Sequence, residues 1–361
     1  MLTIRVEKRS EPSQTMVYAT PFLAVALTVI AGLFLFTFMG KDPWQAITLI
    51  FFDPLTTIYG VSELLVKAAP LILIAIGLSM GFKAGVWNIG AEGQFTMGAV
   101  AGSAVALYFY EVDSVFVLPL MALAGMLGGM AWAAIPAFLK TRFNTNEILV
   151  SLMLVYVATL LLNVMVHGPM RDPDGMNFPE SRLFSASAVL PLLMEQGRAH
   201  AGFLVALVVV AAAWVLQARH ILGFQIRVAG EADKAAGYAG FTKNRLVWVT
   251  FMISGGLAGL AGLFEAAGPV GQLVPALPVG YGFTAIIVAF LGRLNPVGIL
   301  LGGLLLALTY IGGESAQISM SLPKATTSVF QGMLLFFLLG VDILINYRVK
   351  WRAAPVALGG E

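Results

Sequence analysis

The chain has 361 residues, of which 59% are hydrophobic and only 11% are charged, and its mean hydropathy is +0.88. Soluble globular proteins have about 45–50% apolar and about 25% charged residues, so a soluble fold could not cover this much apolar surface. The balance of 21 basic and 19 acidic residues argues against a nucleic-acid partner, and the lack of cysteine excludes disulfides, thiolate metal sites and a cysteine nucleophile. We therefore expect a protein that is surrounded mainly by membrane lipid.

Uncharged runs predict where the chain crosses the membrane, because an apolar helix needs about 20 residues to cross about 30 Å of hydrocarbon. The second run is short, so its helix should begin near Glu63, and the prolines of the eighth run should delay its helix until near Tyr281. The chain is predicted to be an all-α polytopic membrane protein with about ten transmembrane helices and some discontinuous or re-entrant segments. The runs are 17–39, 68–82, 93–110, 114–139, 148–170, 201–218, 246–264, 266–292, 294–313 and 325–341.

Ten crossings place both ends of the chain on the same side of the membrane. With the N-terminus inside, 15 of the 21 lysines and arginines lie in inner segments, which the positive-inside rule favours. The predicted organisation, N-in and C-in, is one transmembrane domain with a cytoplasmic tail at each end and two long loops. The tails cover 1–16 and 348–361, the domain covers 17–347, the outer loop about 168–200 and the inner loop about 219–246.

Shorter patterns add detail to this arrangement. Two apolar segments, 44–52 and 187–194, are too short to span and are expected at the outer face as interfacial or re-entrant pieces. The segments 81–90 and 290–298 are loosely similar, which indicates either a parallel internal repeat or two Gly-rich turns of the same kind. Small residues at four-residue spacing predict close helix packing at Gly98/Gly102, Gly125/Gly129, Gly255/Gly259 and Gly298/Gly302.

The segment GFKAGVWNIGAEGQFTMGAVAG (81–102) concentrates Asn88, Glu92 and Gln94 among glycines where the chain re-enters the membrane. Lipid cannot satisfy the backbone of such a segment, so it must be buried in protein or line water. One interpretation is a discontinuous helix that Asn88 caps while Glu92 faces a translocation path. The alternative is that Glu92 only offsets a helix dipole at a wet interface. Glu147 and Glu265 are further intramembrane candidates.

The inner loop contains GEADKAAGYAG, an alanine-rich stretch that predicts a helix of about two turns at 230–240, capped by Asp233 and ended by Gly240. Such a short helix needs a partner surface to be stable. It is either a projecting element that docks on another protein or an amphipathic turn that lies on the membrane. The neighbouring GYAGFTK (237–243) lacks the glycine spacing and the hydroxyl residue of a phosphate loop. We therefore expect no ATP hydrolysis by this chain and no enzyme activity.

Four blocks carry a resemblance to a known family. GVWNIGAEGQ (85–94), TNEILVSLMLVYVATLLLN (145–163), VAGEADKAAGYAGF (228–241) and GYGFTAIIVAFLGRLNPVGIL (280–300) follow one another in this order. Together they resemble the permease subunits of ABC importers for nucleosides and simple sugars, which are related to the branched-chain amino acid permeases. The resemblance extends over about 17–347.

The resemblance implies a bacterial cytoplasmic (inner) membrane subunit with several partners. These are a separate ABC ATPase, which holds the ATP and Mg²⁺, a second permease, identical or different, and an extracytoplasmic substrate-binding protein. No cofactor is expected in this chain itself. The resemblance also implies that the alanine-rich helix is the coupling helix seated on the ATPase. The residues expected to make this contact are Gly230, Glu231, Asp233, Ala235, Ala236, Tyr238 and Gly240.

A nucleoside is the first predicted substrate, and a simple sugar of the ribose type is the alternative. An uncharged solute needs few charges along an alternating-access path. An ion-coupled secondary transporter and a passive facilitator are the rival classes. The chain departs from the family pattern in having Ala232-Asp233 for Asn-Pro, Val155 for Asn and Thr284 for Asp, which leaves the substrate open. The residues predicted to line the path are Asn88, Glu92, Gln94, Phe95, Asn163 and Phe283.

Overall fold

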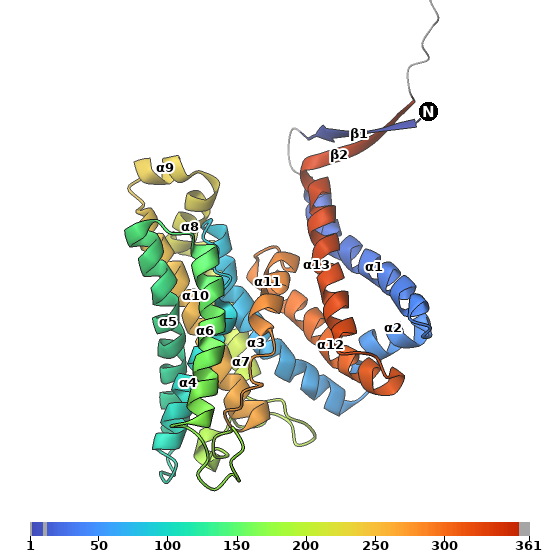
Figure 1. Ribbon diagram of the computed structural model, residues 1–361. Coiled ribbons are helices and arrows are strands. Elements are labelled where there is room, and N and C mark those ends of the chain that lie inside the picture. Colours follow the sequence, from blue (N-terminus) through green and yellow to red (C-terminus); the bar gives the residue numbers. More distant parts are fainter. Residues whose placement is uncertain (1, 10–12, 354–361) are drawn as a thin grey trace, which may run out of the picture. The chain divides into compact units, whose positions relative to one another are not determined.

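The computed structural model describes residues 2–9 and 13–353 and is mainly helical (Figure 1). Its contacts divide the chain into two compact units, Met1–Ile50 with Gly313–Glu361 and Phe51–Gly312, which are described separately below. The prediction of a single transmembrane domain over 17–347 stays a prediction.

In the first unit, helix α1 (Gln14–Phe38) packs on α13 (Ala325–Asn346), and α2 (Pro43–Phe51) follows α1. Strand β1 (Leu2–Lys8) pairs antiparallel with β2 (Tyr347–Ala353), with Leu2 opposite Ala353. The pairing brings the two ends of the described chain together, which agrees with the prediction that both lie on one side of the membrane. The sequence predicted only tails here, although the alternation in TIRVEK and YRVKWR is typical of strands.

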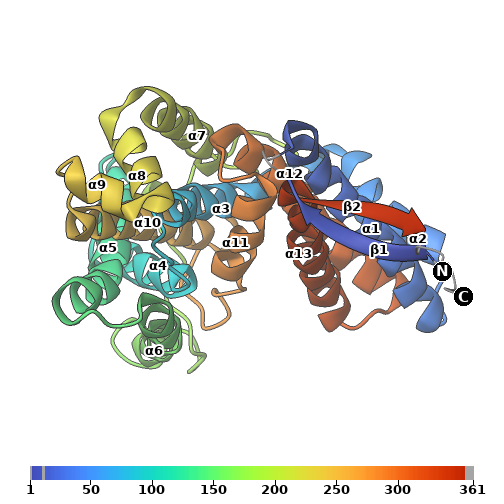
Figure 2. The same ribbon diagram turned by 90° about the horizontal axis from the view of Figure 1, so that it is seen from above.

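The second unit is built around two helices, α3 (Ile58–Lys83) and α10 (Lys243–Glu265). In their most apolar windows 89% and 72% of residues are buried, whereas the figure is 22% for α5 (Val117–Phe143), α6 (Glu147–His167) and α7 (Gly202–Arg219). Seen from above, α3 and α10 lie between α6 and α7 (Figure 2). The remaining elements are η1 (Asp53–Leu55), α4 (Ala91–Tyr108), η2 (Ala186–Ala188), α8 (Ile221–Glu231), α9 (Asp233–Tyr238), η3 (Ala266–Val270) and α11 (Tyr281–Leu291); α12 (Pro296–Met320) runs from this unit into the first.

Glycines bring α4, α5 and α10 into backbone contact, as their four-residue spacing predicts. A Cβ atom on Gly259 of α10 would lie 2.9 Å from the Cα of Gly129 on α5, and one on Gly98 of α4 would meet the backbone of Gly259. Helices in a membrane gain little from the hydrophobic effect against each other, so such close packing supplies much of the attraction.

Helices occupy all ten predicted crossing positions, and eight of those described are long and apolar enough to span a membrane. The exceptions are α4, which has 18 residues as α7 does but carries Glu92 and Gln94 at its start, and α11, which has 11 residues and rises only about 16 Å at 1.5 Å per residue. The predicted start of α11 near Tyr281 is confirmed. The predicted start of α3 near Glu63 is wrong, because Thr57 caps a helix that begins at Ile58 by accepting from the Gly60 N–H at 3.0 Å.

Segments predicted on one side of the membrane contact each other within the second unit. On the predicted inner side, Lys140 pairs with Glu147 at 3.0 Å. On the predicted outer side, Arg198 pairs with Glu63 at 2.5 Å. Of the two short outer segments, 44–52 corresponds to α2, whereas 187–194 forms only the end of the single turn η2 and extended chain.

We predict that Gly259→Val destabilises the bundle by about 1–3 kcal/mol, because the added side chain would overlap with the backbone of α5. The thermal midpoint in detergent should fall. Gly340→Val on α13 is the matched control, since a Cβ there meets nothing within 4 Å and the change in helix propensity is the same. Equal midpoints for the two variants would contradict the proposed close packing.

Candidate functional site

The crossing between α10 and α12 is a broken helix. Helix α10 continues as the π-helix η3, the chain then runs to Gly280 without regular secondary structure, and α11 begins at Tyr281. Gly271 and Gly280 have φ angles of 74° and 94°, in the left-handed region that favours glycine. The start of α11 lies against α4, since a Cβ on Gly282 would meet the backbone of Glu92. A helix N-terminus is therefore placed inside the protein.

The carboxylate of Glu92 binds this N-terminus. Its Oε1 accepts from the Gly280 N–H at 2.7 Å and its Oε2 from the Gly282 N–H at 2.5 Å, and the residue is only 3% exposed. The first N–H groups of a helix have no partner within the helix, and its N-terminus carries a partial positive charge. Glu92 therefore supplies the hydrogen-bond acceptors for the first N–H groups of α11, a helix that is remote in sequence. The sequence suggested that Glu92 is either a path residue or a partner for the dipole of its own helix, and neither interpretation included a bond to another helix.

Asn88 holds the segment before α4 in place. Its side-chain amide exchanges two hydrogen bonds with that of Gln94, at 2.8 and 3.1 Å, and its Nδ2 also donates to Ser254 Oγ of α10 at 2.9 Å. The prediction that Asn88 caps α4 is wrong, because Gly90 occupies the cap position. The Oδ1 atom of Asn88 instead accepts from the Gly90 N–H at 3.1 Å. Asn88 and Gln94 are buried and fasten the loop to α10.

A second polar cluster surrounds Tyr281, the first residue of α11. Its hydroxyl donates to Glu265 Oε1 at 3.2 Å, and Lys67 Nζ lies 3.9 Å from the same oxygen and 5.5 Å from the tyrosine ring centroid. One turn further along, the hydroxyls of Thr284 and Tyr310 are 2.9 Å apart. Glu265 is a candidate from the sequence, whereas Lys67 and Tyr281 are not, because only the fold brings Lys67 of α3 and Tyr281 of α11 to the end of α10.

The outer loop between α6 and α7 is fastened to both ends of this region. Arg198 donates twice to the Glu63 carboxylate of α3, at 2.9 and 2.5 Å, and this hydrogen bonding raises the pKa of the Arg198 guanidinium. Ser181 and Leu273 exchange two hydrogen bonds beside the broken helix. Burial lowers the pKa of His200 to about 4, so this imidazole is neutral at physiological pH. The loop thus joins α3 to the irregular segment that contains Leu273.

The remaining predicted path residues lie in different surroundings. Phe95 is fully buried and packs edge-on against Tyr281, with ring centroids 5.8 Å apart. Phe283 is 41% exposed on α11. The Nδ2 of Asn163 donates to the Thr159 carbonyl of its own helix at 2.8 Å. The structure therefore brings four of the six together, Asn88, Glu92, Gln94 and Phe95, next to the α11 that carries Phe283.

The inner loop forms two helices, and the prediction of one helix across 230–240 is wrong. The backbone breaks at Ala232, with φ −149° and ψ 75°, between α8 and α9. Ala232, and not Asp233, is the N-cap of α9, which ends at Tyr238 before the positive φ of Gly240. The predicted contact residues accordingly divide into two groups. Gly230 and Glu231 end α8, and Asp233, Ala235, Ala236, Tyr238 and Gly240 belong to α9 or follow it.

Helix α9 lies at one end of the second unit, beyond the ends of the long helices (Figure 1). Tyr238 is 95% exposed, while Ala236 is 3% exposed. Gly230 is packed so tightly on the carbonyl of Lys83 that a Cβ there would overlap with it. The α8–α9 pair is thus seated on the end of α3 and presents its far side to the surroundings.

A multi-pass helical bundle with a broken helix at its centre and a projecting helix pair at one end defines a membrane protein of the permease type. The chain belongs to the family of the branched-chain amino acid transport system permease component, whose model matches residues 60–339.

Several characterised relatives resemble the chain along most of its length. It is 37% identical to the glucose ABC transporter permease protein TsgB13 of Haloferax volcanii, over 99% of both chains. It is 28% identical to the guanosine ABC transporter permease protein NupP of Bacillus subtilis, over 88% of this chain and 91% of that one. It is 25% identical to the nucleoside ABC transporter permease protein NupB of Lactococcus lactis, over 90% and 92%. No solved structure gives a significant match.

We predict that Glu92→Gln lowers transport at least about tenfold while the protein still assembles. An amide has one accepting oxygen, so one N–H of the α11 start loses its partner, at a cost of about 1–3 kcal/mol. Uptake into vesicles, normalised to membrane abundance, measures the effect. Asn88→Ala should act in the same direction because it releases the loop before α4.

Glu111→Gln is the matched control, since Glu111 is exposed after the end of α4. Normal uptake in both Glu92→Gln and Asn88→Ala would remove this network from the transport mechanism.

Proposed function

We propose that this chain is the transmembrane subunit of an ATP-driven ABC importer in a bacterial cytoplasmic membrane. A separate ATPase, which holds ATP and Mg²⁺, docks on the α8–α9 pair. Membership of a permease family and the ABC transporter relatives support this proposal. The observation that carries it is α9, a helix of six residues held away from the bundle.

Helix α9 has the character of a docking element. An isolated helix this short is not stable in water, because its nucleation cost exceeds what one or two turns return. A Cβ on Gly237 or Gly240 would meet nothing within 4 Å, and Tyr238 is almost fully exposed. A partner surface that covers this side would bury the tyrosine ring, and such rings dominate binding energy at many protein interfaces.

Movement of α9 has a physical route to the broken helix. Helix α8 is in backbone contact with the end of α3 at Lys83, and the chain then continues into the loop that Asn88 fastens to α10. Glu92, four residues later, is bonded to the start of α11. Because each of these contacts is close and directional, we expect a displacement of α8 to displace α3, the loop before α4 and the start of α11. We propose that rocking of these elements opens the path alternately outward and inward.

A nucleoside remains the first proposed substrate, and a simple sugar is supported by a specific observation, the 37% identity to a glucose permease. Both are uncharged rings with several hydroxyl groups. Phe283 offers an exposed face on α11 for a base or a sugar ring, and Thr284 and Tyr310 offer hydroxyls near it. Val155, at a position where the family has Asn, packs against Gly93 and gives the site no polar group.

The proposed complex has two further partners. A second permease, identical or different, would complete the path, and an extracytoplasmic binding protein would deliver the solute to the outer face. That face includes the outer loop, which Arg198 and Ser181 hold in a fixed position over α3 and the broken helix. A rigid landing surface lowers the entropy lost when another protein binds.

We predict that Ala235→Arg and Tyr238→Ala lower ATP-dependent uptake at least about tenfold, equivalent to about 1.4 kcal/mol of lost interface energy. Both residues are exposed on α9, so folding should be unaffected. Co-purification of the ATPase with the permease is the second measurement and should fall in parallel. Tyr108→Ala, which removes another exposed tyrosine at the predicted outer end, is the control. Unchanged co-purification in both variants would exclude α9 as the docking element.

The substrate is tested in vesicles that contain the complete importer, with labelled guanosine and labelled glucose in turn. We expect uptake to need both ATP and the binding protein, and Phe283→Ala to reduce guanosine uptake more than glucose uptake, because stacking favours the larger flat ring. Glucose uptake alone would assign the chain to the sugar group. Uptake driven only by a proton gradient would contradict the importer and favour an ion-coupled carrier.

A further inference from the structure

An apolar groove lies on the second unit where α5 and α7 leave a gap. Helix α7 packs on α3 and α5 packs on α10, so α3 and α10 form the floor between them. The groove has a volume of about 280 Å³ and is lined only by apolar residues, among them Met80, Met126, Met130, Ala212 and Leu216. Three methionines make the walls adaptable, because their long unbranched side chains adjust to irregular shapes.

Small residues explain why the groove is hollow. Ala212 and Ala213 of α7 face Gly256 of α10, so no side chain fills the space between these helices. Met130 reaches across from α5, and its Cε lies 2.7 Å from where a Cβ of Gly256 would be. In a membrane such an open apolar groove is in contact with hydrocarbon chains.

A second cavity, of about 380 Å³, is lined by the residues that follow the groove along α7. Leu216 lines the groove, and Gln217, the next residue of α7, lines the second cavity together with Arg219 and Arg227. None of the described residues that line it is acidic. Lys83 adds a third cation nearby, since its Nζ donates to Gln217 Oε1 at 2.6 Å. This cationic cavity is at the predicted cytoplasmic end of α7.

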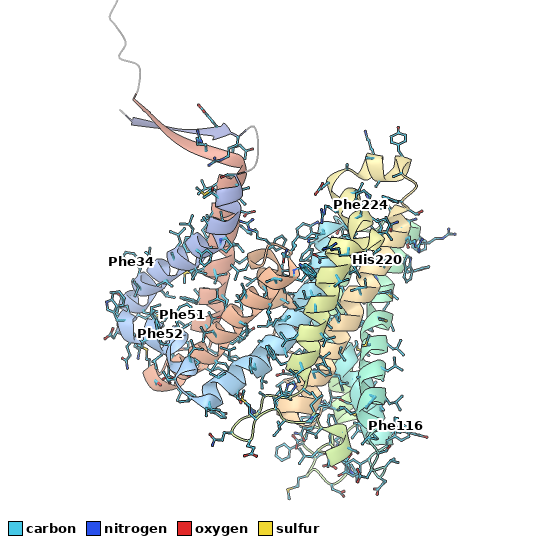
Figure 3. All side chains as sticks on the ribbon, turned by 180° about the vertical axis from the view of Figure 1, so that it is seen from behind. Phe34, Phe51, Phe52, Phe116, His220 and Phe224 are labelled. Atoms are coloured by element: carbon cyan, nitrogen blue, oxygen red, sulfur yellow. The ribbon has the colours of Figure 1, made fainter. Side chains whose placement is uncertain are left out.

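Hydrogen-bond donors and aromatic surface complete the cavity. His220 accepts the Leu222 N–H at its Nδ1 at 3.1 Å, which leaves Nε2 as the ring nitrogen that can donate to an anion. His220 also caps the start of α8, where the helix dipole favours negative charge. Figure 3 shows His220 and Phe224 together at the end of the unit opposite Phe116. Phe224 and Ile221 are exposed there, as is typical of side chains at the membrane interface.

We propose that an anionic phospholipid of the cytoplasmic leaflet binds here, with its phosphate in the cationic cavity and one acyl chain in the apolar groove. The ligand must be charged at one end and apolar immediately beyond it, and it must reach the site from within the membrane. Arginine side chains bind phosphate oxygens in a paired geometry, and basic pockets at the cytoplasmic ends of transmembrane helices select acidic headgroups. This inference does not depend on which solute the protein carries.

The bound lipid has a mechanical consequence. It would join α7, which supplies the groove, to α8, which supplies Arg227 and leads into α9. The headgroup would then help to fix the orientation of the α8–α9 pair at the membrane surface.

The test uses the purified full-length chain with its partner subunits, delipidated and then supplied with phosphatidylglycerol or phosphatidylcholine. Native mass spectrometry counts retained lipids, and thermal unfolding measures stabilisation. We expect phosphatidylglycerol to be retained and to raise the thermal midpoint, and phosphatidylcholine to do neither. The double variant Arg219→Gln/Arg227→Gln should weaken phosphatidylglycerol binding at least about tenfold. Ala212→Trp, which fills the groove, should do the same through the acyl chain.

Matched controls separate this site from general charge and surface effects. Ala211→Trp adds the same ring to the neighbouring residue of α7, which does not line the groove, and Arg245→Gln removes an exposed cytoplasmic arginine outside the cavity. Both should retain the lipid. Equal retention of the two lipids by the unaltered protein would overturn the proposal.

Unchanged phosphatidylglycerol binding in the double variant Arg219→Gln/Arg227→Gln would also overturn the proposal. This outcome can be read even if Ala212→Trp fails to fold. Loss of the ATPase from the double variant with lipid binding unchanged would instead assign the cavity to a protein contact.

Discussion

The start of α11 inside the bundle imposes the constraint on which the surrounding structure depends. A helix that begins within protein at membrane depth exposes N–H groups that neither lipid nor apolar side chains can satisfy, and each unsatisfied group costs several kcal/mol there. The Glu92 carboxylate meets two of them at once. For that carboxylate to be in place, α4 must itself begin deep in the protein, and the Asn88–Gln94 pair and Ser254 hold the preceding loop there. Two interrupted segments thus stabilise each other.

This arrangement bears on how transport is energised. An ion-coupled carrier needs an intramembrane carboxylate that gains and loses a proton or an ion during the cycle. Both oxygens of Glu92 are occupied by backbone N–H groups, and Glu265 is bonded to Tyr281 and close to Lys67. Releasing either group would dismantle the start of α11. The geometry therefore favours a structural role for both carboxylates in holding the broken helix.

The positions of the helices could be predicted from the sequence because charge and proline mark the ends of membrane spans directly. Glycine spacing also indicated the contact of α4, α5 and α10, since small residues on one face permit close approach. The partner of Glu92 could not be predicted, because Gly280 lies 188 residues away and contributes a backbone N–H that every residue type except proline has. The break at Ala232 was missed because it falls between Glu231 and Lys234 at an alanine, a residue with the highest helix propensity, and no glycine or proline marks it.

The two ends of the second unit are linked by one line of stiff contacts. At one end, α8 packs on the end of α3 and α9 extends from α8. At the other end, Arg198 binds Glu63 near the beginning of the same α3, and the loop that carries Arg198 is hydrogen-bonded to the irregular segment before α11. Helix α3 is buried along nearly its whole length, so any movement of this helix must repack its neighbours. The contacts at its two ends therefore connect the α8–α9 pair with the α6–α7 loop and the start of α11, and Pro70, which cannot donate a backbone hydrogen bond within the helix, lies between them.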